Sequence, residues 1–233
     1  LETIVRSMAE EAEKAGVAVV TGDTKVVNRG KCDKVFINTT GIGVLPEKHK
    51  HIGTGQNIQA GDKIIINGSI GDHGMAIMGA REDLNMKSPV TSDCACLNHM
   101  IKAVLDSSNN IRFMRDATRG GLATVLAELA ADSKFGIEVD EDALVVKESV
   151  RGFCELLGFD PMYVANEGKV VMVVGASDAD NVLAALKSTE YGKDAAIIGS
   201  VTEEHVGRGW ISTSVGGKRI IDMLSGEQLP RIC

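Results

Sequence analysis

The chain places polar clusters that combine glycine with an acidic residue at the ends of short apolar runs. Four such clusters occur: TGDTK (21–25), GDHG (71–74), RDATRGG (115–121) and NEGK (166–169). The neighbouring runs are short and rich in Val and Ile, which favours strands over helices. Each cluster taken singly is typical of a turn at a strand end. Together, with Lys25 and Arg119 as cations, they indicate a common polar site.

Predicted strands and helices alternate, but several strands follow one another directly. Strands are expected at 17–22, 34–45, 62–71, 111–116, 136–140, 169–175, 195–201, 209–215 and 218–223. Helices are expected at 2–15, where Gly16 would end the helix, and at 74–84, 94–106, 120–133, 147–157 and 178–188. Successive strands argue against a doubly wound parallel sheet. The predicted fold class is therefore α+β, a mixed α/β sandwich.

Composition and charge exclude several classes of function. The net charge of -7 and the pI near 5.3 disfavour nucleic acid and anionic membrane surfaces as partners. No apolar run reaches the roughly 20 residues of a membrane span, and the first residues form a charged amphipathic helix rather than a signal peptide. We expect a cytoplasmic protein with reduced thiols, because its 5 cysteines are odd in number and irregularly spaced. The start at Leu1, inside a predicted helix, suggests a fragment of a longer chain.

The cluster RDATRGG suits a phosphate, because it precedes an apolar helix whose first N–H groups would be unpaired. Gly120 and Gly121 would let the backbone approach the phosphate, and Arg119 would form a fork to its oxygens. Asp23 and Asp116, at strand ends, could hold Mg²⁺ through carboxylate oxygens. This combination indicates nucleotide chemistry.

The cysteines offer a second set of candidates. Cys94, Cys96 and His99 resemble zinc ligands in type, but no second pair completes a tetrahedral set, so structural thiols are expected there. Cys233 ends the tail SGEQLPRIC, which has no periodicity and could reach about 25 Å when extended. A frayed end and a mobile reactive thiol are both compatible with that composition.

Eight motifs occur in an order that resembles the HypE family of hydrogenase maturation proteins, within the PurM-like ATP-binding superfamily. They are VVTGDTKVV, GDHG, SDCA, RDATRGG, RGFCELLG, NEGK, GKDAAIIG and the terminal LPRIC. The similarity runs from the first residue to the last, and the terminal Pro-Arg-Ile-Cys is its most specific element.

The resemblance implies a carbamoyl dehydratase that makes the cyanide ligands of nickel-iron hydrogenase. In that family the carbamoyltransferase HypF carbamoylates the terminal cysteine, here Cys233. ATP then phosphorylates the carboxamide oxygen, and loss of phosphate and of the nitrogen protons leaves a thiocyanate. The cyanide passes to iron on the HypC and HypD scaffold complex. The full-length family implies a homodimer.

The resemblance also assigns roles to residues. Glu167 would be the base, with Lys25 beside it, and Cys233 would carry the substrate. Asp23 and Asp116 would hold Mg²⁺, while Arg119, Gly120 and Gly121 would bind the phosphates of ATP. Asp72 and His73 are expected in the same pocket.

The domain division follows from the polar, glycine-rich segment 46–61. Residues 1–50 would be the remainder of a PurM N-terminal-like domain, 51–224 a PurM C-terminal-like domain and 225–233 a flexible tail. The family's further N-terminal motifs are missing, so two alternatives remain. One is a binding module for HypF without catalysis, and the other is a different PurM-like kinase or synthetase.

Overall fold

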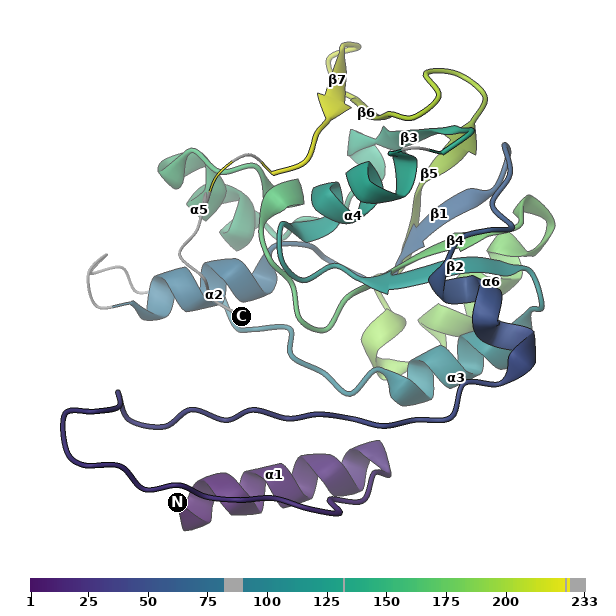
Figure 1. Ribbon diagram of the computed structural model, residues 1–233. Helices are drawn as coiled ribbons and strands as arrows, with labels where there is room; N and C mark the ends of the chain where they lie inside the picture. The colour runs from purple at the N-terminus through teal and green to yellow at the C-terminus, as the bar shows by residue number, and fades with distance from the viewer. Residues whose placement is uncertain (82–89, 132, 225, 227–233) are drawn as a thin grey trace. The chain divides into compact units, whose positions relative to one another are not determined.

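The computed structural model describes residues 1–81, 90–131, 133–224 and 226, and it divides the chain into two compact units (Figure 1). Unit 1 contains residues 1–50, and unit 2 begins at His51. Among the described residues, no helix combines the length and apolar character that crossing a bilayer requires.

Unit 1 consists of one regular helix and a long extended segment. Helix α1 (Glu2–Ala15) ends at Gly16, whose φ of 66° is left-handed, as the sequence predicts. The strands predicted at 17–22 and 34–45 are wrong, because the described residues there form no strand. A strand persists only through hydrogen bonds to a neighbouring strand, and this unit supplies none. Apolar side chains such as Val20, Phe36 and Ile42 are consequently exposed within it.

Unit 2 contains a seven-stranded mixed sheet. Its strands are β1 (Lys63–Ile66), β2 (Ile111–Asp116), β3 (Gly136–Asp140), β4 (Val170–Val174), β5 (Ala196–Thr202), β6 (Gly209–Ser212) and β7 (Lys218–Ile221). Their order is β2-β4-β1-β5-β3-β6-β7. All neighbours are antiparallel except β3 and β6. This arrangement confirms the α+β prediction.

Helices cover both faces of the sheet (Figure 1). Helix α4 (Gly121–Ala130) packs on one face, and α3 (Asn98–Ser107) and α6 (Ala179–Lys187) pack on the other. Helices α2 (Asp72–Ala80) and α5 (Glu148–Leu157) form a smaller apolar cluster with each other. Short 3-10 helices lie at Glu47–Gly53, Glu141–Ala143, Pro161–Tyr163, Ala176–Asp178 and Glu190–Gly192.

Strand β4 is apolar throughout because both of its faces are covered. In β4, Val171 and Val173 join the core under α4, while Met172 and Val174 join the core under α3 and α6. Burying each such side chain contributes about 1.5–3 kcal/mol. This burial holds the loops at the ends of β1, β2 and β4 in place.

Two helices begin more than one residue away from the sequence expectation. Helix α2 begins at Asp72, inside the GDHG cluster, rather than at residue 74. Helix α3 begins at Asn98 rather than at residue 94, because Ser92 and Asp93 hydrogen-bond to other segments. Both differences bring side chains of these motifs into the candidate site.

Candidate active site

Asn166 connects three of the four polar clusters. Its side chain is buried, its Oδ1 accepts from the backbone N–H of Gly71 at 2.8 Å, and its Nδ2 donates to the carbonyl of Ala117 at 2.8 Å. GDHG, RDATRGG and NEGK therefore meet around one amide. The sequence reasoning missed Asn166 as an organising residue. Its only signal was a polar side chain in the loop before an apolar strand.

The fourth cluster, TGDTK, belongs to unit 1. Asp23 and Lys25 are exposed there, and Oδ1 of Asp23 accepts from the backbone N–H of Thr24 at 2.8 Å. Their expected roles beside Glu167 and Asp116 stay predictions. Cys233 lies outside the residues that the structure describes, so its role stays a prediction as well.

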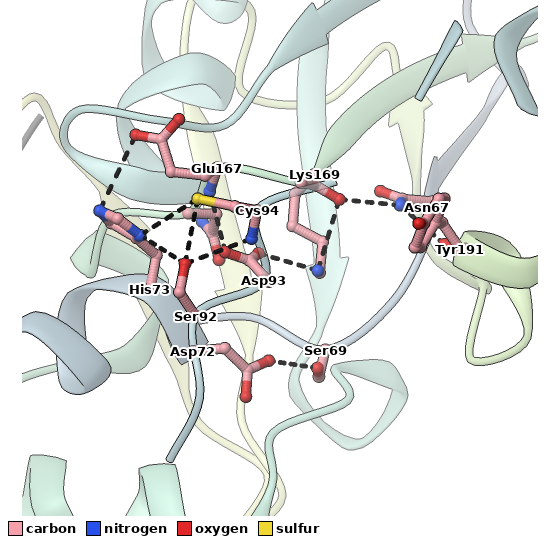
Figure 2. A network of polar contacts seen from close by, with 12 residues as sticks. Asn67, Ser69, Asp72, His73, Ser92, Asp93, Cys94, Glu167, Lys169 and Tyr191 are labelled. Carbon is pink, nitrogen blue, oxygen red and sulfur yellow. Dashed lines mark hydrogen bonds and ion pairs between the residues drawn. The ribbon is translucent and has the colours of Figure 1, made fainter. Parts of the chain in front are cut away.

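The side chain of Asp93 contacts two residues of the NEGK segment (Figure 2). Its Oδ2 lies 2.8 Å from Nζ of Lys169, and its Oδ1 accepts from the backbone N–H of Glu167 at 3.0 Å. A Cβ on Gly168 would lie 1.9 Å from the carbonyl oxygen of Asp93, so only glycine fits there. Neither Asp93 nor Lys169 was predicted as a site residue from the sequence, because the partner of each lies far along the chain.

His73 lies in the first turn of α2, between Glu167 and Ser92 (Figure 2). Its Nε2 is 3.9 Å from Oε1 of Glu167, and its Nδ1 is 2.9 Å from Oγ of Ser92. The same hydroxyl contacts Cys94 Sγ at 3.1 Å. The structure thus brings the predicted residues Glu167 and His73 together.

Asp72 points away from this group. Its buried carboxylate accepts from Oγ of Ser69 and lies 2.9 Å from Nζ of Lys147. These contacts tie the start of α2 to the loop that follows β1 and to the residue before α5. The contacts with Ser69 and Lys147 therefore compensate the buried negative charge of Asp72.

The RDATRGG cluster forms the start of α4. Gly120 and Gly121 have φ of 71° and 63°, and no side chain caps the helix. Each glycine also has a packing reason, since a Cβ on Gly121 would lie 2.4 Å from the carbonyl of Met162, and one on Gly120 would meet Thr124.

The surroundings of this helix start suit an anion. Asp116 and Arg119 are exposed, and Oδ2 of Asp116 accepts from Oγ1 of Thr118 at 2.7 Å. Thr124 Oγ1 is buried without a hydrogen-bond partner among the described residues. An uncapped helix start with an arginine beside it can accept a phosphate, and the carboxylate can accept a metal ion.

A cleft of about 280 Å³ opens beside the Asp93–Lys169 pair. Ser92 and Cys94 line it, whereas Glu167 and His73 do not. Its wall also contains Asn67, whose side chain binds the backbone of Gly168 and Tyr191. The cleft is polar and carries charges of both signs from Lys147, Lys169, Lys193, Asp93, Glu190 and Asp194.

The sequence matches the AIR synthase related protein family. The match covers the C-terminal domain over residues 59–211 and the N-terminal domain over residues 1–45. Carbamoyl dehydratase HypE of Rhodobacter capsulatus is 48% identical over 233 residues, which are 100% of this chain and 68% of that relative. The chain belongs to the HypE family.

Solved HypE structures share this fold. A crystal structure of hydrogenase maturation protein HypE in complex with ATP is 44% identical, with a TM-score of 0.90 over 100% of this chain and 70% of that one. HypE in a crystal structure of a HypE–HypF complex is 48% identical, with a TM-score of 0.88 over 96% of this chain and 72% of that one. These HypE relatives confirm the family and the PurM-like fold that the motifs indicated.

Proposed function

We propose that this HypE family member dehydrates a carbamoyl group carried on Cys233 to a thiocyanate, which supplies cyanide ligands for nickel-iron hydrogenase. The arrangement of Glu167 is the observation that carries the proposal. Its backbone is held by Asp93, while its side chain remains 30% exposed. A carboxylate on a fixed backbone with an accessible side chain can remove protons from a substrate brought to it.

The chemistry requires such a base. Forming a thiocyanate from a thiocarboxamide removes both protons from nitrogen and the oxygen from carbon. The Cys233 thiolate would attack the carbamoyl donor, and Glu167 would accept the nitrogen protons. Lys25 would assist Glu167 by stabilising negative charge between proton transfers.

ATP, when bound, supplies the phosphoryl group that turns the carboxamide oxygen into a leaving group. The start of α4, with Gly120, Gly121 and Arg119, would hold its phosphates. Asp23 and Asp116 would hold Mg²⁺. His73 would border the same pocket, and Asp72, whose carboxylate contacts Ser69 and Lys147, would support the start of α2 behind it. The similarity to a HypE solved with ATP supports this assignment.

The proposed partners follow from the same relatives. HypF would donate the carbamoyl group, as the solved HypE–HypF complex suggests. We further propose that the HypC and HypD complex receives the cyanide, that the protein forms a homodimer, and that these steps occur in the cytoplasm.

Intact-mass spectrometry tests the proposal. The protein is incubated with HypF and a carbamoyl donor, which should add one carbamoyl group to Cys233. Addition of Mg-ATP should then yield a species lighter by one water. A carbamoyl adduct on Cys94, Cys96 or Cys154 would contradict the proposal, as would turnover of a free small substrate by Cys233→Ala. Calorimetry with ATP tests the alternative of a HypF-binding module, for which no heat is expected.

A further inference from the structure

The two ring nitrogens of His73 have different surroundings. Nδ1 lies 2.9 Å from Oγ of Ser92, whereas Nε2 lies 3.9 Å from Oε1 of Glu167. The longer separation exceeds a hydrogen bond, so no proton joins Nε2 to the carboxylate in this arrangement. The side chain of His73 is 8% exposed, which limits its contact with water.

Ser92 determines which ring nitrogen carries the proton. Its hydroxyl donates to Sγ of Cys94 at 3.1 Å, and its oxygen accepts from the backbone N–H of Cys94 at 3.2 Å. With the hydroxyl proton directed to Cys94, the oxygen is left to accept from His73. Nδ1 therefore carries the ring proton, and Nε2 presents a lone pair toward Glu167.

We propose that Nε2 of His73 accepts the proton that Glu167 removes from the substrate nitrogen. This inference rests on the proposed function, in which Glu167 is the base. The thiocarboxamide nitrogen loses two protons in each turnover. A carboxylate that keeps the first proton cannot take the second, so Glu167 must release a proton between the two steps.

The transfers balance in protons and electrons. As the first N–H bond breaks, its electron pair forms a carbon–nitrogen π bond while the carbonyl π pair moves to the oxygen that becomes phosphorylated. As the second N–H bond breaks, its pair forms the second π bond while the carbon–oxygen σ pair leaves with phosphate. Each proton moves to Oε1 of Glu167. The protonated carboxyl group can then approach Nε2 as a donor, which the partly exposed side chain of Glu167 allows. Proton transfer restores the carboxylate and produces an imidazolium. The imidazolium keeps this proton while Glu167 takes the second one. After the turnover its Nε2 proton passes to water beside the partly exposed Glu167 side chain, which restores the ring with its proton on Nδ1.

Two substitutions separate proton transfer from a structural role. His73→Asn keeps an amide donor for Ser92 but has no group equivalent to Nε2. His73→Ala leaves room for added imidazole. Both should slow dehydration of the carbamoylated protein about 100-fold, and imidazole should restore much of the rate only in the alanine variant. His205→Asn, which removes a ring that packs on Trp210, is the matched control and should dehydrate at the normal rate.

A second measurement is independent of turnover. Nitrogen-15 NMR of the histidine rings should show His73 with its proton on Nδ1, and Ser92→Ala should shift the proton toward Nε2. A proton on Nε2 in the unaltered protein would overturn the proposal. Normal dehydration by His73→Asn, or a slow alanine variant that imidazole does not rescue, would also overturn it while leaving the proposed function intact. Absence of dehydrated product from the unaltered protein would refute both.

Discussion

Asp93 Oδ2 lies 2.8 Å from Nζ of Lys169, with both side chains less than a tenth exposed. The pair joins the segment before α3 to the residue that precedes β4. The other carboxylate oxygen of Asp93 accepts a hydrogen bond from the backbone N–H of Glu167. A buried ion pair of this kind orients the loop that carries the proposed base.

Breaking this pair on one side should destabilise the protein strongly. Asp93→Ala leaves the Lys169 ammonium buried without a carboxylate, which should lower the free energy of unfolding by about 3–5 kcal/mol. The double variant Asp93→Leu with Lys169→Met should show a much smaller decrease in the free energy of unfolding, because no charge remains buried. Urea unfolding followed by circular dichroism measures both. Equal losses for single and double variants would show that the charges contribute little.

Glu167→Gln should block dehydration while leaving carbamoylation intact. Glutamine preserves the length of the side chain and the backbone bond to Asp93, but it cannot accept a proton at neutral pH. Intact mass should therefore show the carbamoyl adduct accumulating after addition of Mg-ATP. Formation of the dehydrated species at an unchanged rate would remove Glu167 from the mechanism.

Gly168→Ala should destabilise the site. The new Cβ would lie 1.9 Å from the carbonyl of Asp93, so one of the two segments must move, at a cost of about 1–3 kcal/mol. Gly152→Ala is the matched control, because no atom lies within 4 Å of its Cβ in the middle of α5, and it should gain about 0.5–1 kcal/mol. The midpoint temperature of unfolding should fall for Gly168→Ala and rise for Gly152→Ala. An unchanged unfolding temperature for Gly168→Ala would contradict the close approach of Gly168 to the Asp93 carbonyl.

Asp178 should make stability depend on pH in acid. Hydrogen bonds from Ser108, Ser177 and Asn110 lower the pKa of Asp178 from 3.8 to about 2. A depressed pKa contributes stability above the unfolded value, and this contribution is lost as the pH falls from about 4 toward 2. Asp178→Asn should flatten the pH dependence of the unfolding free energy in that window. If the unfolding free energy of Asp178→Asn varied with pH as steeply as that of the unaltered protein, Asp178 would make no such contribution.

Cys154 should resist alkylation in the folded protein. Burial, followed by the negative charge of Asp160, raises the pKa of the Cys154 thiol from 9.0 to about 11. The reactive thiolate should therefore be about 100-fold scarcer than for an ordinary thiol. Peptide mapping after brief iodoacetamide treatment should find the exposed Cys32 and Cys94 modified early and Cys154 modified only after unfolding. Equal labelling in the native state would contradict the burial.

The apolar runs and helical spacings of unit 2 predicted its strands and helices because both patterns are local. Gly16 likewise marked the end of α1 through its own backbone preference. Local patterns failed at 17–22 and 34–45, where apolar runs remained unpaired because a strand needs a partner. They also failed at the start of α3, where side chains bond to distant segments.

The candidate site shows the same division. Motifs alone pointed to Glu167, His73 and the start of α4, since each motif is short and carries its own chemistry. Asn166, Asp93 and Lys169 gained their roles only in three dimensions, because Asp93 is 76 residues from Lys169 and Asn166 is 95 from Gly71. The sequence by itself determined the family, the fold class and which residue types could react. The tertiary structure decided which of them meet, because burial of both sheet faces brings the loops of distant strands to one place.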